Sequence, residues 1–308
     1  MQYLLQAMNI SKPARYVFFG NYFYGMCAVA LSIESSLQRN YPLNSYLFYV
    51  FIFSLTVLYY TKAYISEKNT GTKNPRSQWY WENRKFVFFS QVALTVLAFI
   101  YPAYVLVEHL SFLISMDALT WLILLVFPFS ATLYYGINHP LFSKLKLRNI
   151  GWLKPFLIGF VWAGLVTIYP FVMADVENKR NFRPDLPAIF LFIKNFMFIT
   201  VLCIMFDIKD YAADHNRQLK TFVVKAGLRK TIFTILIPLC ILGLCSYLLY
   251  GSARGFSVAR ILINVIPFLL LIFVTYSLHR RKSIFYYLVV IDGLMLVKAL
   301  CGSIGVLF

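Results

Sequence analysis

The densest group of acidic side chains lies in residues 206–221, which read FDIKDYAADHNRQLKT. Residues 187–206, directly before it, are mostly apolar and long enough for a helix that spans a membrane. Asp207, Asp210 and Asp214 are spaced i, i+3 and i+7, which places all three on one face of a helix. Three of the 12 acidic residues of the chain are therefore expected where a membrane helix meets water.

Like charges on one helix face repel, so we expect a source of positive charge near this acidic face. One source is a divalent cation such as Mg²⁺, which takes oxygen ligands. The other is a solvated helix end at which Lys209, Arg217 and Lys220 balance the carboxylates. The spacing alone does not separate these two interpretations.

The composition indicates a membrane protein. Hydrophobic residues make up 60% of the 308 residues and charged residues 13%, whereas a soluble domain has about 25% charged residues. Long polar segments are absent from the sequence, so residues 1–308 are predicted to form a single membrane domain. The net charge of +17 lies mostly in short loops between apolar runs, which indicates membrane topology and contact with the bilayer rather than nucleic acid.

The apolar runs predict an all-α bundle of nine transmembrane helices in a multi-pass integral membrane protein, in the cytoplasmic membrane if the source is bacterial. The predicted spans are 16–33, 45–65, 86–106, 113–135, 153–173, 187–207, 230–250, 258–278 and 284–306. With the N-terminus in the cytoplasm, 20 of the 29 Lys and Arg residues fall on the cytoplasmic side and six on the other. This asymmetry favours a cytoplasmic N-terminus and places the three aspartates on the cytoplasmic side.

Two loops of this topology carry chemistry that suits a phosphorylated ligand. The connection before residue 153 carries Lys146 and Arg148, and Lys220 follows the aspartates. If the helices bundle so that these loops meet, a basic cluster lies beside an acidic face. Carboxylates would hold Mg²⁺, and Lys and Arg would bind the remaining phosphate charge of a diphosphate.

The stretch from Asp207 to Asp214, which ends a membrane helix and is followed by Lys220 and Thr221, resembles the second aspartate-rich motif of the UbiA-type intramembrane prenyltransferases. Residues 134–153 resemble the loop between the fourth and fifth helices of that family, and Trp162 falls where the fifth helix often has Trp. The motifs that resemble the family lie within about 90 residues. The order of helices and loops resembles that of the family over most of the chain.

This resemblance implies transfer of a polyprenyl group from its diphosphate to a lipophilic, possibly aromatic, acceptor inside a helix-lined cavity. The partners implied are the bilayer, an isoprenyl diphosphate and the acceptor. Carried over to this sequence, the catalytic and metal-binding residues are Asp207, Asp210 and Asp214, with Mg²⁺ as cofactor. Lys146 and Arg148 would bind phosphate, and Lys220 would be a further phosphate contact.

The sequence departs from the family pattern at the end of the second span. Residues 59–69 read YYTKAYISEKN, where the first aspartate-rich motif is expected, and contain no aspartate. Either Lys62 supplies a fixed ammonium that binds phosphate in place of a metal, or the chain has lost catalysis and binds or carries an isoprenoid or anionic lipid. In the second motif, Gln218 and Leu219 replace the small residue and glycine usual before Lys-Thr.

Charged residues inside the other spans support a third function class. Lys194 lies deep in the sixth span, and Asp292 and Lys298 lie in the ninth. A pair between Lys194 and Asp292 would be structural, whereas a chain of these groups would form the path of a small-solute or ion transporter.

Overall fold

The computed structural model describes residues 11–65, 75–135, 150–216 and 218–308, and every regular element in them is a helix. This confirms the all-α class. A backbone surrounded by lipid must satisfy its own hydrogen bonds, and apolar helices do so without partners. The described residues form two compact units. The first comprises residues 11–29, 45–65 and 75–108, and the second comprises residues 30–44, 109–135, 150–216 and 218–308.

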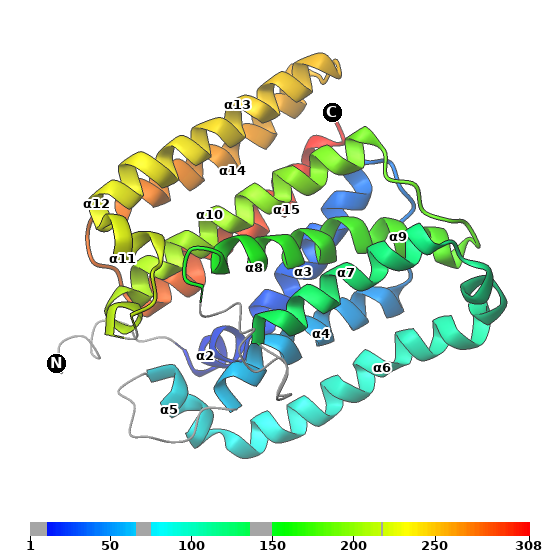
Figure 1. Cartoon of the computed structure of the whole chain (residues 1–308), viewed down its shortest axis with the longest axis horizontal. Helices are drawn as coiled ribbons and strands as arrows, with labels where there is room; N and C mark the ends of the chain where they lie inside the picture. Colours follow the sequence, from blue (N-terminus) through cyan, green and yellow to red (C-terminus); the bar gives the residue numbers. More distant parts are fainter. Residues whose placement is uncertain (1–10, 66–74, 136–149, 217) are drawn as a thin grey trace. The chain divides into compact units, whose positions relative to one another are not determined.

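The first unit contains α2 (Lys12–Phe19), the beginning of α3 (Tyr22–Gln38), α4 (Tyr46–Ile65), α5 (Pro75–Glu82) and most of α6 (Arg84–Ser115) (Figure 1). The predicted span 16–33 is broken here, because α2 and α3 meet at a bend of 63°. Asn21 sits in the bend with a φ of 66°.

Arg76 of α5 stabilises this bend. Its buried guanidinium donates hydrogen bonds to the carbonyl oxygens of Phe18 and Phe19 and to Asn21 Oδ1. Tyr80 donates to the Phe19 carbonyl at 2.9 Å, and burial raises the pKa of Tyr80 to about 12, so the hydroxyl keeps the proton that it donates. Side chains of α5 therefore supply the hydrogen bonds that the helix break removes.

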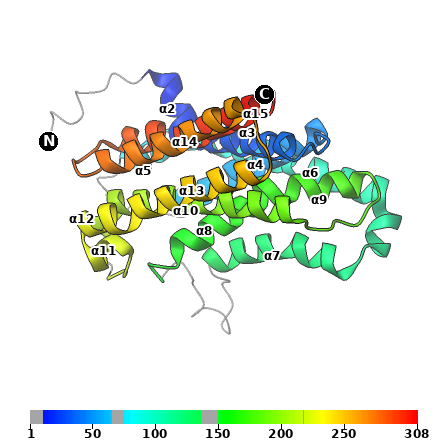
Figure 2. The ribbon, with the colours of Figure 1, turned by 90° about the horizontal axis from the view of Figure 1, so that it is seen from above.

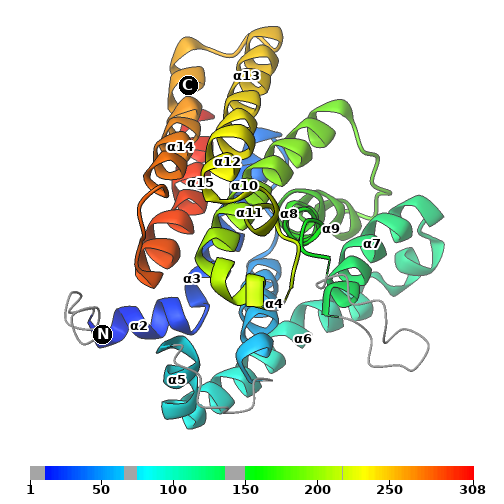
Figure 3. The ribbon, with the colours of Figure 1, turned by 60° about the vertical axis from the view of Figure 1, so that its left-hand side comes forward.

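The second unit contains the end of α3 and of α6, followed by α7 (Ala118–Tyr135), α8 (Lys154–Ala163), η2 (Gly164–Ile168), α9 (Tyr169–Glu177), α10 (Leu186–Asn216), α11 (Phe222–Ala226), α12 (Leu228–Lys230), η3 (Thr231–Leu236), α13 (Ile237–Ala253), α14 (Val258–Ser277), η4 (Tyr286–Ile291) and α15 (Gly293–Gly305). Helix α8 packs beside α10 and α7, and α13 packs against α10 and α14 (Figure 2). Helix α15 packs against α14 (Figure 3).

Seven helices or helix runs of the described residues are long and apolar enough to cross a membrane, and the bent pair α2–α3 would make eight. They match the predicted spans except the fourth, 113–135, where α7 is shorter than the others. The predicted number of nine crossings and the side of the N-terminus stay predictions.

Candidate functional site

Helix α10 carries all three predicted aspartates. Its 31 residues make it roughly 46 Å long, whereas the hydrocarbon core of a bilayer is about 30 Å thick. The helix therefore continues past its apolar part, and Asp207, Asp210 and Asp214 lie on this last section. Asp207 and Asp214 are buried and Asp210 is half-buried, so the acidic face points mostly into the protein.

The nearest cation to Asp207 is Lys154, at the start of α8. Lys154 Nζ donates to Asp207 Oδ1 at 2.9 Å, and the Asp207 side chain is 1% exposed. A lysine at a helix N-terminus opposes the helix dipole, so its position is explained by this ion pair. Asp214 and Tyr134 also interact electrostatically with Lys154. Lys154 was not among the site residues predicted from the sequence.

The second carboxylate oxygen of Asp207, Oδ2, takes no part in this ion pair. Oδ2 is buried and has no hydrogen-bond partner among the described residues. Asp210 pairs with its exposed neighbour Lys209 at 2.6 Å. One buried oxygen of Asp207 is therefore available to a group other than the described residues.

The two loops that were expected to meet do so where they are described. Gly151, just before α8, lies so close to the backbone of Lys220 and Thr221 that a Cβ atom there would come within 2.6 Å of it. Thr221 is buried and caps α11 by accepting a hydrogen bond from the Val224 amide. Lys220 is exposed beside this contact. Lys146 and Arg148 lie outside the described residues, so their role toward phosphate stays a prediction.

Lys62 lies near the end of α4 in the first unit, with an exposed side chain. Around it, the helix end is aromatic and basic. The Tyr64 ring stacks on Tyr80 with centroids 4.9 Å apart, and the Arg76 guanidinium lies 4.4 Å from the Tyr64 centroid. The predicted role of Lys62 toward phosphate stays a prediction.

The aspartates provide the oxygen donors that Mg²⁺ prefers but not a complete metal site. Among the described residues, no group of three or more His, Cys, Asp or Glu side chains could hold a metal ion. Mg²⁺ is commonly bound by one or two carboxylates together with substrate phosphates and water. The donor set, with its unpartnered Asp207 oxygen, therefore fits an ion that is shared with a diphosphate rather than one held by the protein alone.

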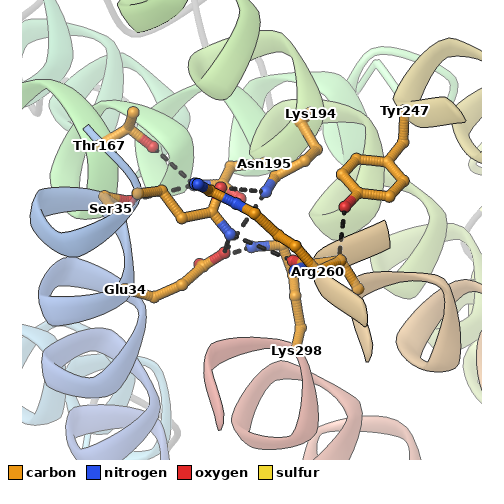
Figure 4. Close-up of polar contacts among 10 residues, drawn as sticks. Glu34, Ser35, Thr167, Lys194, Asn195, Tyr247, Arg260 and Lys298 are labelled. Atoms are coloured by element: carbon orange, nitrogen blue, oxygen red, sulfur yellow. Dashed lines mark hydrogen bonds and ion pairs between the residues drawn. The ribbon is translucent and has the colours of Figure 1, made fainter. Parts of the chain in front are cut away.

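A second buried charge cluster lies toward the other end of α10 and centres on Glu34 of α3, which is fully buried (Figure 4). Lys298 of α15 donates to Glu34 Oε2 at 2.7 Å, and Lys194 of α10 lies 3.4 Å from Oε1. Gln38 bridges them, accepting from Lys194 at 2.7 Å and donating to Glu34 at 2.8 Å. The expected pair of Lys194 with Asp292 is therefore wrong: the carboxylate beside Lys194 is Glu34, one residue past the predicted first span.

Comparison with known proteins supports the fold. Neither the family models nor the curated proteins include a match to this chain. Among solved structures, the chain is similar to a digeranylgeranylglyceryl phosphate synthase, with a TM-score of 0.54 and 14% sequence identity over 96% of this chain and 99% of that one. At this identity the similarity shows that the two chains share a fold.

Proposed function

We propose that this protein is a membrane prenyltransferase that moves a polyprenyl group from its diphosphate to a lipophilic acceptor. The observation that carries the proposal is the juxtaposition, in a prenyltransferase fold, of the buried acidic face of α10 with Lys154 and the 218–221 turn. This end of α10 combines carboxylate oxygens with ammonium groups and borders the apolar part of the same helix. A diphosphate with an apolar chain has the matching distribution of charge and apolar surface.

In the proposed reaction, the bond between the first prenyl carbon and the diphosphate oxygen breaks, and the diphosphate leaves with the electron pair. The acceptor forms a bond to that carbon and loses one proton. Lys154 and Lys220 would bind and orient the diphosphate, and their positive charge favours the leaving anion. Asp207, Asp210 and Asp214 would hold Mg²⁺, which when bound neutralises diphosphate charge.

The test is release of diphosphate by the purified protein from radiolabelled isoprenyl diphosphates of several chain lengths. We expect release that stops when EDTA removes Mg²⁺ and that Asp210→Asn lowers at least about a hundredfold, the range typical of a lost electrostatic contact in a transition state. Asp117→Asn is the matched control, because Asp117 also forms an ion pair near the surface but lies in the turn between α6 and α7. Turnover that is unaffected by Asp210→Asn would refute the proposed site.

A catalytically inactive relative that binds isoprenoid or anionic lipid is the second candidate. The observation in its favour is the ion pair of Asp207 with Lys154, which neutralises one of the three carboxylates without a metal. Tight binding of an isoprenyl diphosphate without release of diphosphate would select this candidate. The third hypothesis, a small-solute or ion transporter with a path along Lys194, Asp292 and Lys298, stays a prediction, and both lysines contact the buried Glu34.

A further inference from the structure

A cavity of about 130 Å³ lies beside the Glu34 cluster, at the end of the second unit opposite the aspartates. Its walls come from the end of α3, from α10, α13 and α14, and from the turn before α14. They include Gln38, Arg39, Phe190, Lys194, Tyr247 and Phe268. Most of the lining is aromatic or aliphatic, and Lys194 brings a mostly buried ammonium group to it, with its side chain 16% exposed.

Positive charge exceeds negative charge around this cavity. Glu34 carries one negative charge and contacts both Lys194 and Lys298. Arg260 is near enough to Lys194 to interact with it electrostatically (Figure 4). Its guanidinium lies 4.0 Å from the centroid of the Phe256 ring. Arg39 also lines the cavity, but Asp185 pairs with it at 2.6 Å. One carboxylate thus faces three cations.

Excess charge of one sign is costly in a membrane protein, and such groups normally pair or contact a ligand. Lys194 has three N–H donors, and Gln38 and Glu34 accept two of them. In the part of the chain that the structure describes, the third donor has no acceptor, and Lys194 also lines the cavity. An anion in this cavity would accept the third hydrogen bond and would also reduce the excess positive charge.

The surroundings of the cavity indicate where such an anion comes from. Phe190 and Ile193 line it and are 46% and 44% exposed on a helix that spans the membrane, so they contact lipid. About 130 Å³ is roughly four water volumes. That space holds a phosphate with adjoining glycerol atoms but not the acyl chains, which would lie along Phe190 and Ile193.

We propose that this cavity binds the phosphate head of an anionic phospholipid, with Lys194 as its cationic contact. The site is separate from the proposed diphosphate site. Lys194 and Asp207 are 13 residues apart on α10, roughly 20 Å along the helix. The lipid supplies the negative charge that Glu34 alone does not, and it fixes α3, α10, α13 and α14 around one headgroup.

The experiment compares binding of phosphatidylglycerol and phosphatidylcholine with the same acyl chains to delipidated protein, measured by native mass spectrometry. We expect the protein to prefer phosphatidylglycerol by about fivefold or more, the effect of one lysine on an anionic lipid. Lys194→Gln should remove the preference, since Glu34 keeps Lys298 as its partner and the fold remains. Lys179→Gln, the same change at an exposed loop lysine, should leave the preference unchanged.

Ser246→Phe tests the cavity without changing a charge, because Ser246 is an exposed residue of α13 that lines it. We expect this variant to lose phosphatidylglycerol and to keep its elution volume on gel filtration; it decides the question if Lys194→Gln does not fold. Equal binding of the two lipids, or a preference that survives both substitutions, would overturn the proposal. Displacement of phosphatidylglycerol by inorganic phosphate at similar concentrations would also overturn it, since the site would then bind a soluble anion.

Discussion

The ion pair between Lys154 and Asp207 is the residue-level feature on which the proposed site depends. Lys154 is partly exposed and Asp207 is buried, so removing one partner leaves the other charge without compensation. We expect Lys154→Met and Asp207→Leu each to lower the free energy of unfolding by about 2–3 kcal/mol, somewhat less than for a fully buried pair. Reversible unfolding in mixed micelles measures this.

The double variant Lys154→Met/Asp207→Leu separates stability from chemistry. With both charges gone, it should lose less stability than the two single variants together, because no unpaired charge remains. Diphosphate release should stay lost. A double variant that is fully active would show that the pair is structural and lies outside the site.

The acidic face could be predicted from spacing alone, because i, i+3 and i+7 fix one helix face whatever the rest of the chain does. The partner of Asp207 could not, since it comes from a helix 53 residues earlier in the chain. Glu34 was missed for a related reason. It follows an apolar run directly, and its two lysine partners are 160 and 264 residues away in sequence.

At the level of elements, the packing of α7 beside α8 and η2 depends on Gly164, the first residue of η2. A Cβ atom on Gly164 would overlap the Phe127 ring. That ring is held by Phe160, Tyr169 and Phe192, with centroids 5.0 to 6.0 Å away. Because the ring has no room to move, Gly164→Ala should cost about 1–3 kcal/mol of unfolding free energy.

Gly293→Ala is the control for this substitution. Position 293 begins α15, and a Cβ atom there meets no heavy atom within 4 Å among the described residues. Alanine should be neutral or stabilise by up to about 1 kcal/mol, because glycine loses more backbone freedom on folding. Equal losses at positions 164 and 293 would mean that helix packing at Phe127 is not the cause.

The break between α2 and α3 depends on a side chain from another helix. Arg76→Met removes the donors to the carbonyls of Phe18 and Phe19, and we expect a loss of about 2–3 kcal/mol. Arg84→Met, an exposed arginine two residues after α5, should stay within about 0.5 kcal/mol of the parent. Thermal unfolding in detergent compares them. If both variants behave alike, the bend does not depend on Arg76.

The apolar runs predicted where helices lie because twenty apolar residues have few alternatives in lipid. The bend at Asn21 was not predicted, because the apolar run 16–33 has the length of one straight span. The change of direction depends on the buried Arg76, which lies in another helix. The shorter α7 shows the same limit: composition indicates an apolar helix but does not fix its length.

For the whole molecule, contacts within the second unit bear on the number of crossings. Asp117, in the turn between α6 and α7, pairs with Arg183, in the loop after α9, and its backbone amide donates a hydrogen bond to Asn181 Oδ1 at 3.2 Å. These two connections therefore lie on one side of the membrane. The run from Lys154 to Glu177 is a membrane span, so residue 154 lies on the other side.

We therefore predict that helix α7 crosses the membrane between the Asp117 turn and the side on which Lys154 lies. Its 18 residues extend roughly 27 Å, close to the thickness of the hydrocarbon core. With the bent pair α2–α3 counted as one crossing, this argument predicts nine crossings, an odd number. The two termini are then predicted on opposite sides, as the distribution of Lys and Arg also predicts.

Single cysteines in a cysteine-free background, labelled with a membrane-impermeant maleimide, test this topology. Ser115→Cys and Lys179→Cys should react from the outside in intact cells, whereas Ile150→Cys and Gln218→Cys should react only after the membrane is opened. All four positions are exposed, so a difference in labelling reports the side of the membrane. Reaction of positions 115 and 150 from the same side would mean that α7 does not cross and that the count is even. With either result, the aspartates of α10 are expected on the same side of the membrane as position 150, because Gly151 is in close contact with the 218–221 turn.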